Sequence, residues 1–533
     1  MNGYGSSRDA APQPLLADEA STLPQLTCVA YALPLLGVGG CVLLFEVYLL
    51  KFATDTLYIS PATMGIIFSI SRLWDAISDP LAGYLCDITK TDFGRRRLWM
   101  LCAAPFMGLS FFAAFSPPTA LAATVLAGDA QSGFLLACWM LVAVLFYYTA
   151  FTAFKMPSNA LGVELSESAA YHERSRLYGY KSLFDGVGSL IGVGMMALLM
   201  SRESLGPDRV RSVATACTSS FGLFTALIIA ASVALLRESP GRHLQPRANP
   251  LSLVPIVLGS PHARLFTGVL VLHDGCKASF GNLAPYALQY VAELPPSMVP
   301  AAVAAYLVAN VIAVPMWLWA GRRWGKLRAF RASMILNALA FLPMTLVLYR
   351  PLVAATTDSQ RLALACLCAG LVGFGANARG NLGESIAGDI IDYDHAMSGE
   401  RKQGVYFAFW MLSQKTAGGC VTLLSGFLLD MAGFVPNREQ SFPCKVAITL
   451  AFVAMPLVGM ALAVWLFSRF GLDEVAHKNV RRTIAEMEEH RMDEQQLSRR
   501  RQLLSRSHAR SHSQSHAQST DADVDAGKPP ALL

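Results

Sequence analysis

Long apolar runs, each closed by charged or turn-forming residues, dominate the pattern of positions along this chain. Six runs come first, a polar break follows, and six more complete the series. They occupy residues 26–50, 62–86, 98–117, 134–162, 178–200, 214–236, 264–292, 298–320, 328–349, 361–388, 404–430 and 446–468. Each run is long enough to supply the roughly 20 residues that an α-helix needs to cross a bilayer. The pattern predicts an all-α membrane protein with twelve transmembrane helices.

The polar stretches predict how the chain is organised. Residues 237–263 are rich in proline and basic residues, so we expect a cytoplasmic linker between two six-helix halves, at 26–236 and 264–470. Residues 1–25 predict a polar cytoplasmic segment. Residues 471–533 predict a cytoplasmic tail that is helical where charges are dense and disordered in its Ser- and His-rich end.

Composition narrows the class of protein further. Of the 533 residues, 53% are hydrophobic and only 15% are charged, whereas soluble domains are about 25% charged. This balance argues against a nucleic-acid-binding protein and against a secreted disulfide scaffold. The eleven cysteines show no metal-ligand spacing, and no nucleophile is paired with a base. We therefore expect neither an enzyme nor a cofactor.

Basic residues are distributed unevenly between alternate loops. The termini, the linker and every second loop carry 29 of the 43 Lys and Arg residues, and the other loops carry only 8. Because positively charged loops stay in the cytoplasm, this asymmetry predicts that both termini are cytoplasmic. A plasma membrane or a bacterial inner membrane is the expected location.

The two halves carry matching charge signals at corresponding positions. Gly94 and three arginines follow the second run, and Gly321-Arg322-Arg323 follows the eighth. The fourth run ends in Glu164 and then Glu173-Arg174, and the tenth ends in Asp389, Asp392 and Glu400-Arg401. Internal repeats of this kind are typical of secondary transporters, whose central site lies between the halves. The sequence therefore predicts two pseudo-symmetric six-helix halves.

Charged residues inside the predicted spans need a reason, because each is costly to insert into a bilayer. Asp75 and Asp79 are four residues apart, so they share one face of a helix. Two neighbouring carboxylates repel each other and favour binding of H⁺ or a metal cation such as Na⁺. The alternative is a pair that Arg72 neutralises permanently. Lys415 in the eleventh run is the expected counter-charge when no cation is bound.

Two further polar groups lie within the spans. Tyr148, Thr152, Lys155 and Asn159 are spaced by 4, 3 and 4 residues and therefore share one helix face. Lys155 has no carboxylate within a turn of its own helix, so it needs a partner on another span. His273, Asp274 and Lys277 form a local cluster in the seventh run. A self-neutralised structural cluster and a cavity role are equally open for it.

Several motifs in the chain resemble one known family. They are the run from Arg72 to Pro80 with Gly83 and Gly94–Arg97, Pro157 with Ala160, Leu161, Glu164 and Leu165, Glu173-Arg174, Asp389 with Asp392 and Tyr393, Lys415, and Gly433–Asn437 with Gln440. In this order they resemble the glycoside–pentoside–hexuronide:cation symporters, the melibiose-permease branch of the major facilitator superfamily. The resemblance covers residues 26 to about 470 and implies the major facilitator fold.

The resemblance also implies roles for individual residues. Asp75, Asp79, Thr152 and Lys415 match the family's cation site. Contacts between the halves near the second-run and tenth-run motifs would latch one closed state. The residues expected to take part in gating are Arg72, Arg95, Arg96, Arg97, Glu164, Asp389, Asp392 and Arg401.

The galactoside-binding positions of the family do not transfer to this chain. The family's first-helix acid aligns near Gly39, its fourth-helix acid with Lys155 and a nearby aromatic residue with Asn159, and the tenth-helix aromatic region reads Ala378-Arg379-Gly380. Loss of acids and gain of cations favours an anionic solute, or a lipid-like solute as in the family's lysophospholipid-carrying animal relatives. The expected substrate-binding residues are Tyr148, Lys155, Asn159 and Arg379.

The function predicted from the sequence is a symporter, coupled to H⁺ or Na⁺, that moves a sugar derivative or an organic acid by alternating access and acts as a monomer in the bilayer. A lysophospholipid or other amphiphile transporter is the alternative within the same family. A membrane sensor or scaffold that has lost transport is the alternative from another class of protein.

Overall fold

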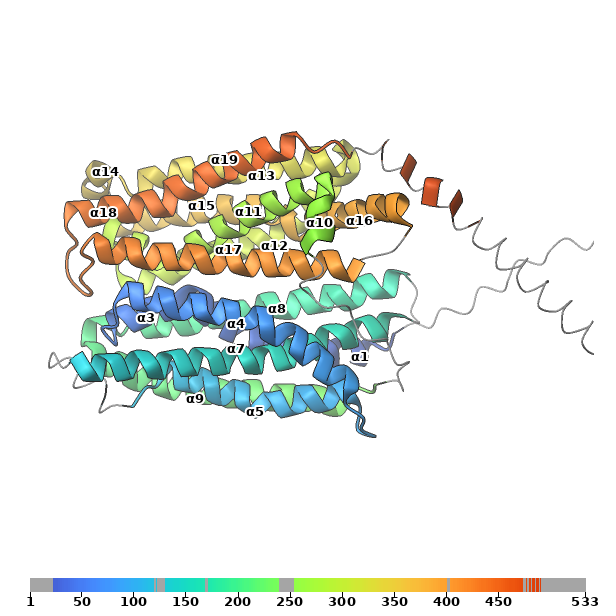
Figure 1. The fold of residues 1–533 in the computed structure, drawn as a ribbon. Helices are drawn as coiled ribbons and strands as arrows, with labels where there is room; N and C mark the ends of the chain where they lie inside the picture. The colour runs from blue at the N-terminus through green and yellow to red at the C-terminus, as the bar shows by residue number, and fades with distance from the viewer. Residues whose placement is uncertain are drawn as a thin grey trace, which may run out of the picture. The chain divides into compact units, whose positions relative to one another are not determined.

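The computed structural model describes residues 23–118, 121, 130–167, 171–238, 254–399 and 403–472, with single positions between 476 and 489. Two compact units divide the chain, Met1–Ile386 with Gly404–Phe470 and Ala387–Gln403 with Gly471–Leu533. The helices considered below belong to the first unit, except for the part of α16 that follows Ile386 and for Gln403 at the start of α17. None of the described residues is in a β-strand (Figure 1).

Among the described residues, six long helical stretches form the first half of the fold. The first stretch consists of four consecutive segments and is interrupted at Pro34, which has no N–H to donate to a helical hydrogen bond. The segments are α1 (Gln25–Ala32), α2 (Leu35–Leu43), the π-helical turn η1 (Leu44–Tyr48), α3 (Leu49–Asp55), α4 (Pro61–Ile88), α5 (Arg95–Phe115), α7 (Ala130–Glu167), α8 (Tyr171–Met200), η2 (Glu203–Leu205) and α9 (Pro207–Leu235).

Six more stretches form the second half. Several of them also contain a π-helical turn, in which one extra residue changes the direction of the following side chains. The segments are α10 (Val254–Gly259), α11 (Pro261–Tyr286), η4 (Ala287–Val291), η5 (Pro296–Met298), α12 (Val299–Trp324), α13 (Lys326–Val347), α14 (Arg350–Ala355), α15 (Asp358–Ala376), η6 (Arg379–Gly383), α16 (Glu384–Ser398), α17 (Gln403–Met431), α18 (Phe442–Thr449), η7 (Leu450–Ala454) and α19 (Met455–Ser468).

These stretches confirm the predicted all-α membrane architecture. Within the described residues, nine helical stretches are long and apolar enough to cross a membrane. The other three long helices, α4, α11 and α17, have charged residues near their middles, namely Asp75, Asp274 and Lys415. The predicted segment 1–25, the linker 237–263 and the tail 471–533 lie mostly outside the described residues, so the predicted domain boundaries stay predictions.

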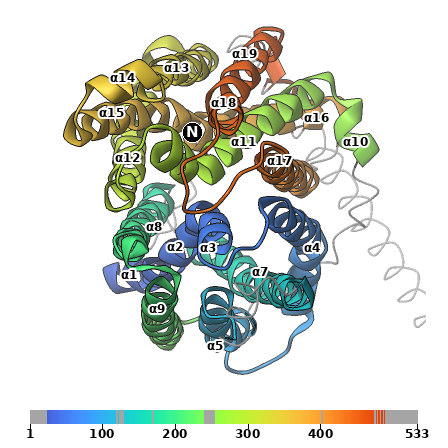
Figure 2. The same ribbon diagram turned by 90° about the vertical axis from the view of Figure 1, so that its left-hand side faces the viewer.

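Packing repeats between the two halves. In the first half α4 packs on α7, and α5 packs on α7 and α9; in the second half α12 packs on α15, and α13 packs on α15 and α19. The equivalent helices α5 and α13 both begin after a glycine with positive φ, at Gly94 (φ 104°) and Gly325 (φ 85°). Figure 2 shows the two groups of helices side by side. The internal repeat read from the charge pattern is therefore present in the packing.

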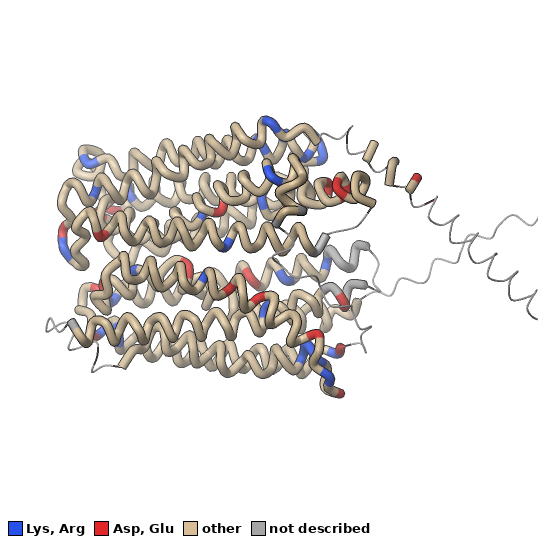
Figure 3. The backbone as a smooth tube through the Cα atoms, in the orientation of Figure 1, with Lys and Arg blue, Asp and Glu red and all other residues tan. Residues whose placement is uncertain are grey.

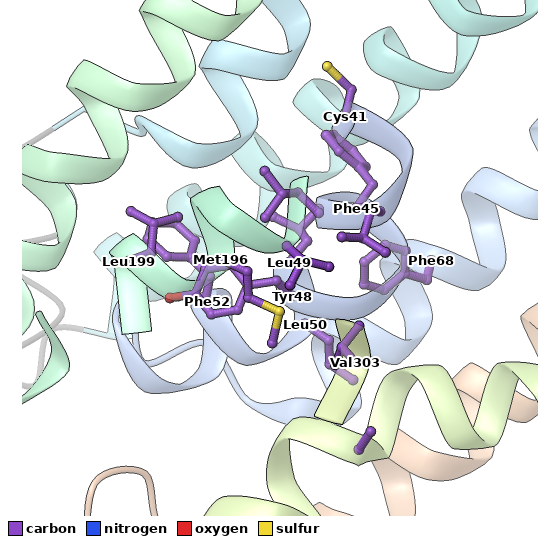
Figure 4. Packing of buried hydrophobic residues seen from close by; sticks show 14 of the residues in the cluster. Cys41, Phe45, Tyr48, Leu49, Leu50, Phe52, Phe68, Met196, Leu199 and Val303 are labelled. Atoms are coloured by element: carbon purple, nitrogen blue, oxygen red, sulfur yellow. The ribbon is translucent and has the colours of Figure 1, made fainter. Parts of the chain in front are cut away.

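The core of the first half is built around the first helical stretch. Phe45, Tyr48, Leu49 and Phe52 are buried, and Figure 4 shows them among side chains from α8 and from α12 of the second half. Phe45 stacks on Tyr147 of α7 with ring centroids 3.6 Å apart. This packing places η1, and the residues on either side of it, at the contact between the halves.

Candidate functional site

The predicted cation-site residues come together where α4 and α7 of the first half face α17 of the second. Lys415 Nζ lies 3.2 Å from Asp75 Oδ2 and also pairs with Asp79 Oδ2. Thr152 Oγ1 of α7 donates a hydrogen bond of 2.7 Å to Asp79 Oδ1. One ammonium therefore bridges the two halves through two carboxylates, at mid-length of helices that are otherwise mostly uncharged (Figure 3).

This cluster has one carboxylate more than it has ammonium groups. Asp75 is 1% exposed, and its Oδ1 atom has no hydrogen-bond partner within the described part of the chain. A buried carboxylate oxygen without a partner is costly, and a small cation is the group that satisfies it. The donor set of carboxylate and hydroxyl oxygens suits H⁺ or a hard cation such as Na⁺.

Arg72 does not neutralise the aspartate pair by direct contact. Its guanidinium lies 3.8 Å from Glu46 Oε1 and sits over the Tyr148 ring at 5.0 Å from the ring centroid. The alternative in which Arg72 is the direct partner of Asp75 is therefore not the arrangement found. Arg72 lines the central cavity, and its predicted role in gating stays a prediction.

A cavity of about 650 Å³ lies between the halves next to Lys415. Its wall combines apolar side chains with charged ones from both halves. The charged lining residues are Glu46, Arg72, Lys155, Asp185, Asp274, Lys277, Arg379 and Lys415. Five basic side chains thus face three carboxylates, which is the environment expected for a solute that carries an anionic group.

Two of the four predicted substrate-binding residues reach this cavity. Lys155 lines it and lies over the Phe151 ring at 5.0 Å, and Arg379 lines it while donating to Asp274 Oδ2 at 2.8 Å. Tyr148 and Asn159 are not among the lining residues. Asn159 accepts a hydrogen bond of 2.7 Å from Lys181, which explains why this amide does not point into the cavity.

The cluster on the seventh span is completed by a residue from elsewhere in the sequence. Asp274 is paired with Arg379 of η6, and the distance from its Oδ1 atom to His273 Nδ1 is 3.8 Å. His273, Asp274 and Lys277 all line the cavity. Asp274 therefore pairs with a residue of another helical stretch, and the cluster forms part of the cavity wall.

In this structure the first-half residues of the predicted latch contact residues of their own half, and the latch itself stays a prediction. Arg95 and Arg96 at the start of α5 contact Glu164 near the end of α7, at 2.9 and 2.6 Å. Arg97 donates to the Val233 carbonyl of α9 at 2.9 Å. The partners found for these residues belong to the same half, because the turn at Gly94 points the start of α5 toward α7 and α9. Asp389 and Asp392 belong to the second unit, and Arg401 lies outside the described residues.

A buried ion-pair cluster does connect the halves, and sequence reasoning missed it. Lys51 Nζ contacts Asp55 Oδ2 at 2.7 Å and Glu203 Oε1 at 3.0 Å, and the Lys51 side chain is 0% exposed. From the second half, Tyr290 Oη donates to Asp55 Oδ2 at 2.5 Å. In addition, Gln289 Nε2 donates to Glu203 Oε2 at 3.2 Å. These contacts close the end of the interface at which α3, η2 and η4 meet.

Two more contacts seal the same end. Thr54 and Tyr286 share a hydrogen bond of 2.7 Å between their hydroxyls. Asn437, in a left-handed conformation with φ 56°, donates to the Asp55 carbonyl at 2.7 Å. Asn tolerates this conformation better than most residues. The only available signal in the sequence was a Lys and an Asp four residues apart at the end of an apolar run.

Fold and site together define a multi-pass membrane transporter with a charged site between two repeated halves. A family model described as MFS/sugar transport protein matches residues 30–474. The match covers most of the chain, and the chain therefore belongs to the MFS/sugar transport protein family. This confirms the predicted family of cation symporters within the major facilitator superfamily.

Relatives of known class cover most of the chain. The sodium-dependent lysophosphatidylcholine symporter 1-B of Danio rerio is 22% identical over 495 residues, which cover 86% of this chain and 88% of that protein. The putative glycoside/cation symporter YagG of Escherichia coli (strain K12) is 24% identical, with 76% and 83% covered. A mutant of the nucleoside transporter NupG shares the fold, with a TM-score of 0.58 at 12% identity over 83% of this chain and 99% of that one.

Proposed function

We propose that this protein is a cation-coupled symporter that carries a solute with an anionic group across a membrane by alternating access. The observation that carries the proposal is the Lys415 ammonium held between Asp75 and Asp79, with a partnerless oxygen on Asp75. The names of the sodium-dependent and glycoside/cation relatives support cation coupling. The choice between Na⁺ and H⁺ is a matter for experiment.

The cation site supplies the coupling in this proposal. A cation that binds between Asp75 and Asp79 replaces the Lys415 ammonium as their counter-charge. Lys415 is then free to face the cavity that it already lines. Because Lys415 belongs to the second half and the aspartates to the first, the exchange changes the attraction between the halves. Binding of the cation is thereby linked to the rocking of one half against the other.

The charge of the cavity wall favours an anionic solute. Five basic side chains outnumber three carboxylates there, and Lys155 makes no ion pair with any described residue. A sugar acid or another organic acid fits this balance. The lysophosphatidylcholine symporters among the relatives support a second candidate, a lysophospholipid whose head group occupies the polar wall and whose chain contacts the apolar one.

The positive-inside pattern of the loops completes the proposal. Both termini are assigned to the cytoplasm, in a plasma membrane or bacterial inner membrane, and the protein acts as a monomer. With this orientation the Lys51 cluster lies at the external end, because Lys51, Asp55 and Glu203 flank loops poor in basic residues. The structure would then represent a state closed to the outside.

Transport by purified protein in liposomes tests this proposal directly. Uptake of a sugar acid, a matched neutral sugar and a lysophospholipid is compared under an imposed Na⁺ gradient and an imposed H⁺ gradient. Asp79→Asn and Lys415→Ala are each expected to abolish uphill accumulation while the protein stays folded in the membrane. Full concentrative uptake in either variant contradicts the assigned cation site.

A second measurement separates a transporter from a sensor or scaffold. Cation binding to the purified protein without solute, followed by calorimetry, is expected in the native chain and is expected to disappear in Asp75→Asn. Glu439→Gln removes an exposed carboxylate that pairs with Lys445 and does not line the cavity, and it serves as the matched control. Cation binding that survives in Asp75→Asn, or that is absent from the native chain, supports the non-transporting alternative.

A further inference from the structure

Glu46 is the one acid within the first helical stretch that faces the cavity. It lies on the π-helical turn η1, where its neighbours Leu44, Phe45 and Tyr48 are buried. The Glu46 side chain is 43% exposed and lines the cavity. π-Helical turns recur at functional sites because they redirect side chains that a regular helix would point elsewhere. The turn therefore presents an isolated carboxylate to the cavity.

The backbone at Glu46 lies at the contact between the halves. Its carbonyl oxygen is 3.9 Å from the position that a Cβ atom would take on Gly281 of α11. The turn η1 packs on α11, and Figure 2 shows the first stretch beside α11. Glu46 therefore lies close to cavity residues of both halves.

Three basic side chains share the cavity wall with this carboxylate. Arg72 of α4 lies 3.8 Å from Glu46 Oε1. Lys277 of α11 and Lys155 of α7 line the same cavity as Glu46. Neither lysine makes a hydrogen bond or a short ion pair with any residue that the structure describes. Both ammonium groups are thus available to an anion that enters the cavity.

Three other acids near the cavity have closer partners. Asp274 accepts a hydrogen bond from Arg379 at 2.8 Å, and Asp75 and Asp79 hold Lys415. Glu46 and Asp185 are the two lining carboxylates left to offset Arg72, Lys155 and Lys277, and of the two Glu46 is the one that lies 3.8 Å from Arg72.

We propose that Arg72, Lys155 and Lys277 form a binding site for an anionic group, and that Glu46 occupies this site electrostatically as an internal counter-ion when no solute is present. The inference rests on the proposed transport function and deepens it. A phosphate or a carboxylate that enters the site takes over the three basic partners, and Glu46 turns away from them. Glu46 therefore competes with the solute, and its removal strengthens binding of the anion.

The sign of this effect distinguishes the proposal from a simpler role for Glu46. An acid that binds solute hydroxyls or a solute ammonium directly would be needed for affinity, and Glu46→Gln would weaken binding. An internal counter-ion has the opposite effect. Glu46→Gln is expected to tighten binding of an anionic solute by about tenfold, while Lys277→Gln weakens it by about the same factor, since each change removes one interaction with a charge.

Four probes test the site in the full-length protein in lipid nanodiscs, in two matched pairs. Glucuronate is compared with methyl glucoside, and a monoacyl glycerophosphate is compared with the monoacylglycerol that lacks its phosphate. Each affinity is measured by calorimetry in the native chain and in Glu46→Gln, Lys277→Gln and Glu439→Gln, the last a control that removes a carboxylate 79% exposed to solvent. The anionic member that binds identifies the source of the anionic group as a small acid or a lipid head group.

The expected result is that one anionic probe binds more tightly than its neutral match. Glu46→Gln is expected to strengthen the binding of that anionic probe alone. Weaker anion binding in Glu46→Gln, or an equal effect of Glu439→Gln, overturns the proposal. So does the lack of a preference for either anion in the native chain. If Asp75→Asn still abolishes cation binding in that case, the proposed transport function stands and only the anion site fails.

Discussion

Lys155 is the residue at which substrate class can be tested most simply. Its ammonium lines the cavity, lies over the Phe151 ring and makes no ion pair with any described residue. Lys155→Gln is expected to raise the apparent KM for an anionic solute tenfold or more, because a lost charge-assisted contact costs about 1.5–3 kcal/mol. The dependence of uptake on cation concentration should stay unchanged. Initial uptake rates measured against solute and cation concentration check both statements.

Lys181→Gln is the matched control for this experiment. Lys181 donates to Asn159 at 2.7 Å and is not among the lining residues. Its loss should leave the KM for the solute within about twofold of the native value, since it removes a charge that the cavity wall does not present. A changed cation dependence with an unaltered KM in Lys155→Gln would instead mean that Lys155 serves the aspartate pair, and the reason for preferring an acid would disappear.

Thr152 allows a milder test of the cation site than the aspartates do. Its hydroxyl donates to Asp79 at 2.7 Å, so Thr152→Val removes a polar ligand and keeps the shape of the side chain. The half-saturating cation concentration is expected to rise about fivefold, which corresponds to roughly 1 kcal/mol for one neutral partner. Thr416→Val is the control, because the Thr416 hydroxyl donates only to the Leu412 carbonyl of its own helix. Equal responses of the two variants would remove Thr152 from the site.

Single residues also show how far the sequence could predict this site. Asp75 and Asp79 were predictable because their spacing places two charges on one face of an apolar helix. Glu46 and Lys51 were not, because a lone charge near the end of an apolar run is equally compatible with the membrane surface. Only the packing shows that Lys51 is completely buried and that Glu46 faces the cavity. Partners such as Arg379 and Asp274, 105 residues apart, follow from tertiary structure alone.

At the scale of elements, α5 and α9 depend on a contact between two glycines. A Cβ atom on Gly108 of α5 would lie 2.5 Å from the Gly222 carbonyl oxygen, and one on Gly222 of α9 would lie 2.7 Å from the Gly108 oxygen. Such close backbone approach is typical of membrane helices that pack through small residues. Gly108→Ala is therefore expected to destabilise the protein by about 1–3 kcal/mol through overpacking.

Thermal unfolding in detergent, followed by tryptophan fluorescence, measures this effect. Gly194→Ala in α8 is the matched control, because nothing lies within 4 Å of the Cβ that it adds. Both substitutions gain the higher helix propensity of Ala, so a difference in Tm between them reports the α5–α9 contact alone. A Tm of Gly108→Ala equal to that of Gly194→Ala would show that the two helices can move apart at no cost.

The elements themselves were largely readable from hydrophobic runs. Each predicted run falls on a helical stretch, closely for the run at 98–117 and α5, whereas α8 and α9 begin seven residues before their runs and α16 extends ten residues beyond its run. The π-helical turns were not predicted, because one extra residue does not disturb a run that is apolar on all sides. This omission matters for function, since η1 carries Glu46 and η6 carries Arg379.

At the scale of the whole molecule, the two charged connections between the halves differ in kind. Lys415 and the aspartates form ion pairs across the interface, and parting them without a replacement leaves buried charges, at a cost of about 3–5 kcal/mol. The Lys51 cluster keeps its ion pairs within the first half and reaches the second half through uncharged donors such as Tyr290 and Gln289. Those hydrogen bonds can be exchanged for water at a smaller cost.

This difference predicts that the halves can part at the Lys51 cluster without breaking an ion pair. Parting Lys415 from Asp75 and Asp79, in contrast, requires a cation that replaces the Lys415 ammonium. Tyr290→Phe removes the hydroxyl donor to Asp55 and retains the ring, so it should weaken closure by about 1 kcal/mol and raise the ratio of open to closed molecules about fivefold. Spin labels at Leu205 and Phe442, which are 58% and 69% exposed, report the distance between the halves at this end.

Tyr48→Phe is the matched control for this measurement. Tyr48 is buried in the adjoining turn, and its hydroxyl has no hydrogen-bond partner in the described part of the chain. Removing that hydroxyl should leave the distance distribution unchanged, whereas Tyr290→Phe should add a longer component. The distances are measured by pulsed electron paramagnetic resonance, in a background that lacks the exposed Cys102 and Cys420. If both variants give the native distribution, the Tyr290 contact does not hold this end closed, and closure must depend on the apolar packing beneath it.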